Sequence, residues 1–339
     1  MPRLIHLDKM PSRKTRRSPE ELAHWDPGAS GLRIVELLRE YRYLTPTLLA
    51  LVYASERGRG ASQVRHHLRK LYDHEFVERY YRPAEPRTGS YEMVYTLALK
   101  GAHLIVPTEE WASERRRIYN LARPRGDYEH LLAVSLLRVL WQLGAPEHDQ
   151  LFRTAAYWVD KEGDREHVRN SFTVRVGGGR ATVRPDTTAV ILRRLPTGKL
   201  HYRPVFFEIE RTHKNLVRTR ERLLAYRALL TSQHEVVARV VEKEVGYVPL
   251  NGQLVFITAH YEHALSLWRT ARGVFGLEGR STKVVPDVWF LPLTSLFEKD
   301  ADGRERIIPP AALFERPILF NLESRRDRDE PARWGRLIA

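Results

Sequence analysis

The chain has 339 residues, a formal net charge of +14 and no cysteine. That length is ample for a hydrophobic core and predicts two or three domains. The lack of cysteine excludes disulfides, thiolate zinc sites and cysteine nucleophiles, and it is compatible with a cytoplasmic protein. The positive charge favours a polyanionic partner, most often nucleic acid. No apolar stretch is long enough to cross a bilayer, so we expect no membrane partner.

Residues 1–27 are basic and lack sustained periodicity, so we expect a partly disordered tail. Residues 28–106 contain three helical patterns and then two strand-like runs. The second helix is signalled by Thr45 as N-cap and Pro46 at the first helical position. The runs in order are a helix to about Tyr43, helices Pro46–Ala54 and Gln63–His74, and strands Phe76–Tyr81 and Tyr91–Leu97.

This order of elements is typical of a winged helix–turn–helix, in which the third helix enters the major groove of DNA. The exposed face of that helix would present Arg65, His66, Arg69 and Lys70, and the wing would add Arg87. Such side chains favour contacts to phosphates and base edges, although winged helices also serve protein contacts. Because many winged-helix proteins read two half-sites, a homodimer is plausible.

A charged connection over 107–126 separates this unit from a second domain at 127–295, which a C-terminal extension follows at 296–339. The second domain begins with an apolar helix, Tyr128–Leu143. Strands are expected at Ser171–Val176, Ala181–Leu192, Tyr202–Glu210, Gln253–Thr258 and Val285–Leu291. Helices are expected at Lys214–Leu230 and Glu262–Arg272, and residues 300–339 are expected to be extended or loosely packed.

The helix at Lys214–Leu230 has an apolar pattern that predicts its inner face. We place Leu216, Val217, Leu223 and Leu224 on that face, and Arg218, Arg222 and other arginines elsewhere. Residues 180–227 hold 12 basic and 4 acidic residues, so basic charge concentrates around the few acids. A polyanionic substrate would explain that concentration, and so would a solvated basic surface.

Acidic residues mark the centre of the second domain. Glu208 and Glu210 end an apolar strand and share one of its faces, because side chains alternate along a strand. Asp186 follows Pro185 on the preceding segment, and Glu129 stands at the start of the first helix. Asp186, Glu208, Glu210 and Glu129 are therefore candidate ligands for Mg²⁺ or Mn²⁺, which take oxygen ligands.

Pro185-Asp186 and Glu208-Ile209-Glu210 resemble, in order and spacing, the motif of PD-(D/E)xK nucleases. The resemblance implies a restriction-endonuclease-like domain with a mixed sheet flanked by helices. Glu210 stands where that family has its lysine, which puts cleavage in doubt; Lys214 or Arg211 would then supply the charge. From about Leu32 to about Leu291 the chain resembles the replication-relaxation family of plasmids, phages and integrative elements.

The family resemblance implies an α+β or α/β protein that binds double-stranded DNA and acts in replication, relaxation or transfer of a mobile element. One hypothesis is a metal-dependent endonuclease or nickase, with Asp186, Glu208, Glu210 and Lys214 as catalytic residues and Arg211 and Arg218 holding the strand. The alternative is a non-catalytic initiator, accessory factor or repressor that keeps the nuclease-like domain as a platform. Replication or transfer proteins of the same element are the expected protein partners.

Each acid also has a structural interpretation. Asp186 after a proline is typical of a turn cap, and Glu129 at a helix start is favourable to the helix dipole. Glu208 and Glu210 are also consistent with a structural ion network with Arg211, Arg184 or Arg203.

Overall fold

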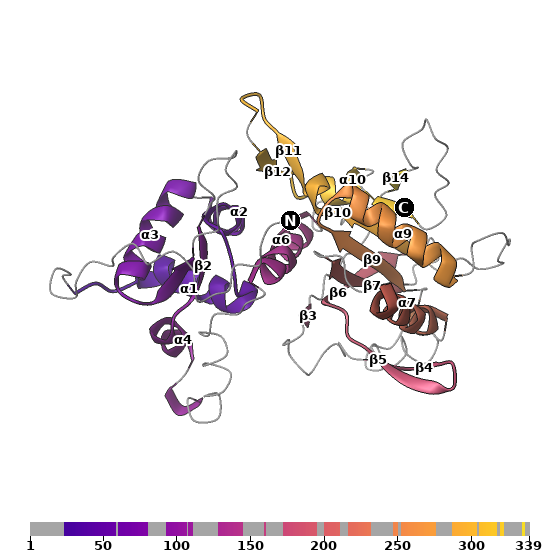
Figure 1. The fold of residues 1–339 in the computed structure, drawn as a ribbon. Coiled ribbons are helices and arrows are strands. Elements are labelled where there is room, and N and C mark those ends of the chain that lie inside the picture. The colour runs from indigo at the N-terminus through magenta and orange to yellow at the C-terminus, as the bar shows by residue number, and fades with distance from the viewer. Residues whose placement is uncertain are drawn as a thin grey trace. The chain divides into compact units, whose positions relative to one another are not determined.

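The computed structural model divides the chain by its internal contacts into a first unit, Met1–Val139, and a second unit, Leu140–Ala339. Both units mix helices and strands, so the protein is α+β (Figure 1). The structure describes residues 24–58, 60–80, 93–106, 108–110, 128–144, 159–160, 172–194, 200–210, 216–231, 247–249, 252–275, 287–303, 305–316, 319–321 and 334–335. Within these ranges no helix is both long and apolar enough to span a membrane.

The first unit begins with α1 (Gly28–Tyr41), α2 (Pro46–Arg57) and α3 (Ala61–Asp73). The start of α2 lies where the sequence predicts it: Thr45 Oγ1 accepts a hydrogen bond from the Leu48 amide at 3.2 Å, and Pro46 follows the cap. The helix ends at Gly58, whose φ of +63° suits a residue without a side chain. Buried aliphatic residues of the three helices form the core of this unit.

After α3 the chain forms an antiparallel pair, β1 (Val77–Tyr80) and β2 (Val94–Leu97), followed by α4 (Leu99–Ile105) and the 3-10 turn η3 (Thr108–Glu110). A bridge between Leu44 and Tyr95 ties the pair to the helices. Gly101 of α4 lies so close to the chain that a Cβ there would meet the Phe76 carbonyl oxygen at 2.0 Å. A side chain at this position would push α4 off the strands, so only glycine fits.

Helix α6 (Tyr128–Gly144) contains the boundary between the units. Its part in the first unit is bonded to the end of α1: Ser135 Oγ donates to the Tyr41 carbonyl at 2.7 Å, and Arg138 bonds both the carbonyl and the carboxylate of Glu40. The Arg138 guanidinium also lies 4.6 Å from the centroid of the Tyr41 ring. These contacts fix α6 to α1, since they satisfy carbonyl groups that the end of α1 leaves open.

The second unit is built on one mixed sheet with the strand order β14-β13-β10-β9-β7-β6-β3, and β8 pairs with β7 beside this path. The strands β7, β9 and β10 run parallel to one another, and β3, β6, β13 and β14 pair with their neighbours antiparallel. The bounds are β3 Val159–Asp160, β6 Thr187–Arg194, β7 Leu200–Glu210, β8 Tyr247–Pro249, β9 Gln253–Thr258, β10 Val288–Pro292, β13 Leu319–Asn321 and β14 Trp334–Gly335.

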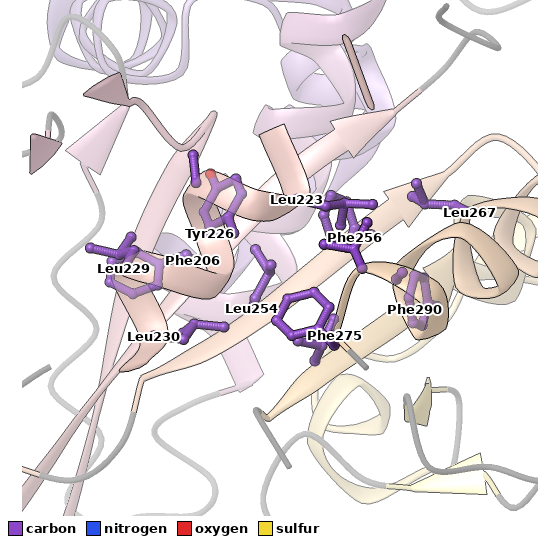
Figure 2. Close-up of a cluster of buried hydrophobic side chains, with 14 of the residues drawn as sticks. Phe206, Leu223, Tyr226, Leu229, Leu230, Leu254, Phe256, Leu267, Phe275 and Phe290 are labelled. Atoms are coloured by element: carbon purple, nitrogen blue, oxygen red, sulfur yellow. The ribbon is translucent and has the colours of Figure 1, made fainter. Parts of the chain in front are cut away.

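Two helices, α7 (Leu216–Thr231) and α9 (Tyr261–Phe275), pack with one face of this sheet. Their side chains join Phe206, Leu254, Phe256 and Phe290 of the strands in one buried cluster, in which Tyr226 is also enclosed (Figure 2). The sheet has a second apolar face, on which Phe207 meets Trp141 of α6 with ring centroids 5.7 Å apart. Burial on both faces explains why the central strands read as continuous apolar runs.

The strand predicted at Ala181–Leu192 is wrong, because the structure breaks it at residues 184–186. Residues before the break form a hairpin of their own, β4 (Phe172–Val176) with β5 (Gly179–Val183), outside the main sheet. Residues after the break form β6, which pairs with β7. Pro185 lacks an amide hydrogen, so it cannot continue a ladder, and the chain changes direction there.

The expectation that residues 300–339 are loosely packed is also wrong for the part of them that the structure describes. After η5 (Leu293–Leu296), the hairpin of β11 (Phe297–Lys299) with β12 (Glu305–Ile307) leads to α10 (Ala312–Glu315) and then to β13, which pairs with β10. Leu313, Phe314 and Leu319 are buried, and the Phe314 ring lies 5.1 Å from Trp141. This segment therefore contributes to the core of the second unit.

Candidate functional site

Helix α3 exposes a basic face in the first unit. Val64, Leu68 and Leu71 are buried at helical spacing, so the opposite side of the helix faces solvent. Arg65, His66 and Arg69 are exposed, as the sequence predicts for a surface that meets a ligand. Three such donors on consecutive turns of one helix are suited to phosphate oxygens and base edges.

Two further residues of α3 lie closer to the protein. Lys70 is half-buried, and its ammonium group lies 5.6 Å from the centroid of the Trp25 ring. His67 is half-buried as well; burial lowers its pKa, and the positive charges of His66 and Lys70 lower it further. His67 is thus held neutral near pH 7, and the fixed charge on the exposed face comes from Arg65 and Arg69.

Asp186 and Glu208 are brought together in the second unit, where β6 and β7 pair. Asp186 precedes β6, and its amide donates to the Phe207 carbonyl at 2.9 Å. Its Oδ2 accepts a hydrogen bond from the Ile209 amide at 2.8 Å. Asp186 is therefore bonded to the residues immediately before and after Glu208 in β7. Asp186 and Glu208 are only 6% and 4% exposed, so their carboxylates need compensation inside the protein.

Helix α7 supplies that compensation. Arg222 forms ion pairs with both acids of β7: its Nη1 lies 3.1 Å from Glu208 Oε2, and its Nη2 contacts Glu210 Oε2. Tyr226, one helical turn later, donates its hydroxyl hydrogen to Glu208 Oε1 at 2.5 Å. Both oxygens of Glu208 are therefore engaged by side chains of α7. We call Asp186, Glu208, Glu210, Arg222 and Tyr226 the buried ion network.

The buried ion network keeps the phenol of Tyr226 protonated. Burial raises the pKa of Tyr226 well above its usual value, and the negative charge of Glu208 and the hydrogen bond to it raise it further. The Arg222 guanidinium also faces the ring of Phe256 at 5.9 Å from its centroid. The hydrogen bond to Glu208, the ion pair with Glu210 and the aromatic contact together stabilise the charge of Arg222, whose side chain is only 22% exposed.

Arg222 and Tyr226 are the site residues that sequence reasoning misses. The helical pattern places Arg222 away from the inner face and Leu216 and Val217 on it, and this assignment is wrong. Leu216 and Val217 are 67% and 62% exposed, while Thr219, Leu223, Tyr226 and Leu230 are buried. The spacing of Arg222 and Tyr226 by one helical turn was the available signal, but it gains meaning only beside a strand that carries two acids.

A divalent cation does not fit these residues as they are arranged. Glu208 uses one oxygen for Arg222 and the other for Tyr226, and Glu210 is ion-paired to the same arginine. In the described part of the chain no three His, Asp or Glu side chains gather as a metal site requires. Glu129, the fourth predicted ligand, is half-buried in the first turn of α6 and belongs to the first unit.

The other predicted site residues are distributed as follows. Arg218 is exposed near the start of α7. Arg87, Arg211 and Lys214 lie outside the described residues, so their predicted roles in DNA binding and catalysis stay predictions. Glu208 and Glu210 do form an ion network, as one interpretation of the sequence has it, but their partner is Arg222, which that interpretation does not name.

Comparison with known proteins gives one family and two remote structures. The family model described as replication-relaxation matches residues 35–242. Two solved structures of the restriction endonuclease FokI, one bound to DNA and one without it, show 10% sequence identity and TM-scores of 0.24 and 0.25. Each covers 78% of this chain, which spans only 42% and 43% of the FokI chains. No curated protein matches the chain.

Proposed function

This chain belongs to the replication-relaxation family, and we propose that it is a double-stranded DNA-binding protein that acts in the replication, relaxation or transfer of a mobile element. The observation that carries the proposal is the exposed basic face of α3. Arg65 and Arg69 lie one helical turn apart, and His66 is exposed beside them. A helix presenting such side chains fits the major groove, whose width admits one helix.

The proposal includes a winged helix–turn–helix in the first unit. Support comes from the order of α1, α2 and α3 before the antiparallel pair of β1 and β2. In such domains the third helix is the one that reads DNA, and the loop of the strand pair contacts the backbone. Arg87, which lies between β1 and β2 in the sequence, would make that contact here.

For the second unit we propose a nuclease-like platform that does not depend on a metal. Asp186 directly precedes β6 and the two glutamates lie on the neighbouring strand β7, an arrangement similar to that of a PD-(D/E)xK domain, but the charge of the glutamates is balanced by Arg222. An arginine that holds both glutamates takes up the oxygens that a cation would need. The function that we propose therefore includes no hydrolysis of DNA, and the protein would act as a non-catalytic initiator, accessory factor or repressor.

DNA binding is tested on the full chain by fluorescence anisotropy with a labelled 30-base-pair duplex. R65Q/R69Q removes two charges and keeps polar side chains of similar length; we expect affinity to fall about 10- to 100-fold. The control variant R269Q/K299Q removes two charges from exposed positions of α9 and β11. Equal affinities of the two double variants would refute DNA recognition by α3.

The second candidate function is metal-dependent nicking, which the bonds that hold Asp186 beside Glu208 favour. A supercoiled-plasmid assay with Mg²⁺ or Mn²⁺ separates the two functions. The platform function predicts that wild type leaves the plasmid supercoiled. Nicking by wild type that is lost in D186A would establish the second candidate instead.

A further inference from the structure

The hairpin of β4 and β5 has two faces of opposite character. On one face Phe172, Val174 and Val183 are buried in the cluster that α7 covers. Phe172 reaches the main sheet, where its ring centroid lies 5.4 Å from that of Phe206. The hairpin is therefore anchored by its apolar face, and the residues that alternate with that face along the two strands are exposed.

The outward face carries arginine and threonine. Its exposed residues are Thr173, Arg175, Arg180, Thr182 and Arg184, which we call the arginine ribbon. The sequence from 172 to 184 contains three arginines and no acidic residue. The ribbon thus has a net charge of +3 from its own side chains.

The register of the hairpin makes this charge costly. Arg175 is directly opposite Arg180, and Thr173 is opposite Thr182. Like charges in directly opposed positions destabilise an antiparallel pair, whereas neutral polar side chains would solvate this face equally well. Folding alone therefore gives no reason for arginine at these positions, and a polyanion lying on the ribbon would offset the repulsion.

The turn at the tip of the hairpin is made of glycines, which carry no side chains. Gly177 and Gly178 have φ values of +55° and +84°, and a Cβ on either would meet no atom within 4 Å. The tight turn requires glycine, because positive φ is unfavourable for other residues. It also leaves no side chain at the tip that would keep a large ligand away from the arginines.

We propose that the arginine ribbon is a second DNA-contacting surface, which binds the phosphate backbone of double-stranded DNA. Arg180 lies on β5 and Arg184 is the first residue after that strand, so the two are four residues apart, a span of at most roughly 13 Å at about 3.3 Å per residue. Duplex DNA carries about one charge per 1.7 Å of its axis, so several phosphates lie within that span. The guanidinium group matches phosphate in a bidentate geometry, and a two-stranded ribbon fits a DNA groove.

This inference rests on the proposed function, since it assumes that the chain binds DNA, but it uses residues of the second unit alone. The test variant is R175Q/R180Q in the full chain, again compared with R269Q/K299Q. Removing the opposed charges should leave the thermal midpoint equal to or above that of wild type. A folding defect would therefore be visible as a lowered midpoint, and the single variants R175Q and R180Q would then carry the measurement.

Binding is measured with the labelled 30-base-pair duplex from 50 to 300 mM KCl. If both arginines contact phosphates, the negative slope of log K against log [KCl] should become shallower by about 1.8 in R175Q/R180Q, because each contact contributes about −0.9. We expect a 5- to 50-fold loss of affinity at 100 mM KCl. A slope and affinity equal to those of R269Q/K299Q would overturn the inference.

Two further comparisons show whether a negative result contradicts the ribbon alone or the proposed function as well. If R65Q/R69Q weakens DNA binding and R175Q/R180Q does not, the ribbon fails and the proposed function stands; if neither does, the proposed function fails. Binding to labelled poly-L-glutamate is measured in parallel. A ribbon variant that loses poly-L-glutamate binding but keeps DNA binding would assign the ribbon to an acidic protein partner and overturn the inference.

Discussion

The arginines of α3 and Arg222 of α7 differ in whether their charge is exposed to solvent or paired inside the protein. On α3, Arg65 and Arg69 are exposed and their charge is available to a ligand. On α7, Arg222 is mostly buried and its charge is used by Glu208 and Glu210. The difference is one of solvent: an exposed cation is screened by water and salt, whereas a buried one must be matched by charge inside the protein. Net charge alone therefore overstates the charge that is available to a ligand.

The largest effect should come from removing the internal cation. In R222M two buried glutamates lose their counter-charge, and we expect unfolding free energy to fall by about 3–5 kcal/mol at pH 7. Urea denaturation measures this loss, with the exposed R220M as the control that should change it by less than about 0.5 kcal/mol.

A second measurement shows that the loss arises from unpaired charge. Adding E208Q and E210Q to R222M should restore part of the stability, because neutral amides cost less to bury than carboxylates. If R222M is as stable as wild type, then the glutamates are compensated elsewhere and the contrast between α3 and α7 does not hold.

A smaller effect is expected for Y226F, which removes one hydrogen bond to a charged group. The cost should be about 1.5–3 kcal/mol. The same bond should also make stability depend on pH. The pKa of Tyr226 is higher in the folded state than the unfolded value of 10.0, so its contribution to the unfolding free energy is complete below pH 10 and declines as the pH rises further. Unfolding free energies from pH 8 to 11 should fall less steeply in Y226F than in wild type, and parallel curves would contradict this assignment.

The smallest effect is expected for a surface ion pair of the first unit. Arg33 of α1 bonds both oxygens of Glu56 at 2.8 and 2.6 Å, yet the Glu56 side chain is 32% exposed, whereas the two glutamates paired with Arg222 are only 5% and 3% exposed. R33M should cost only about 0.5–1 kcal/mol, and the cost should shrink in 0.5 M NaCl. A loss as large as that of R222M, or one independent of salt, would show that burial is not what separates the two ion pairs.

Local sequence signals located most of the elements. The Thr45–Pro46 pair predicted the start of α2, and the apolar run up to Glu210 predicted the end of β7. These signals succeed because a cap and an alternating strand depend on residues that are neighbours in the chain. The same alternation placed Glu208 and Glu210 on one face, and the structure confirms that both meet Arg222 on that face.

The errors have a common cause. An amphipathic pattern counts every arginine as a surface residue, so it missed Arg222 and put Leu216 in the core. An apolar run across Pro185 predicts one strand, although its two halves pair with different partners. The polar composition after residue 300 predicts loose packing, yet β13 pairs with β10 and β14 pairs with β13 at one side of the main sheet. In each case the partner is distant in the sequence.

The sequence by itself determined the basic charge of the chain, the helix–helix–helix–strand order of the first unit and the two acids at the end of β7. Only the tertiary structure decided what balances those acids, because Arg222 and Tyr226 reach Glu208 through the packing of α7 on the sheet. It also decided that Arg175 and Arg180 stand opposite each other on an exposed hairpin. Charge is a property of the sequence, but whether that charge is buried and paired or exposed to a ligand depends on distances that only packing sets.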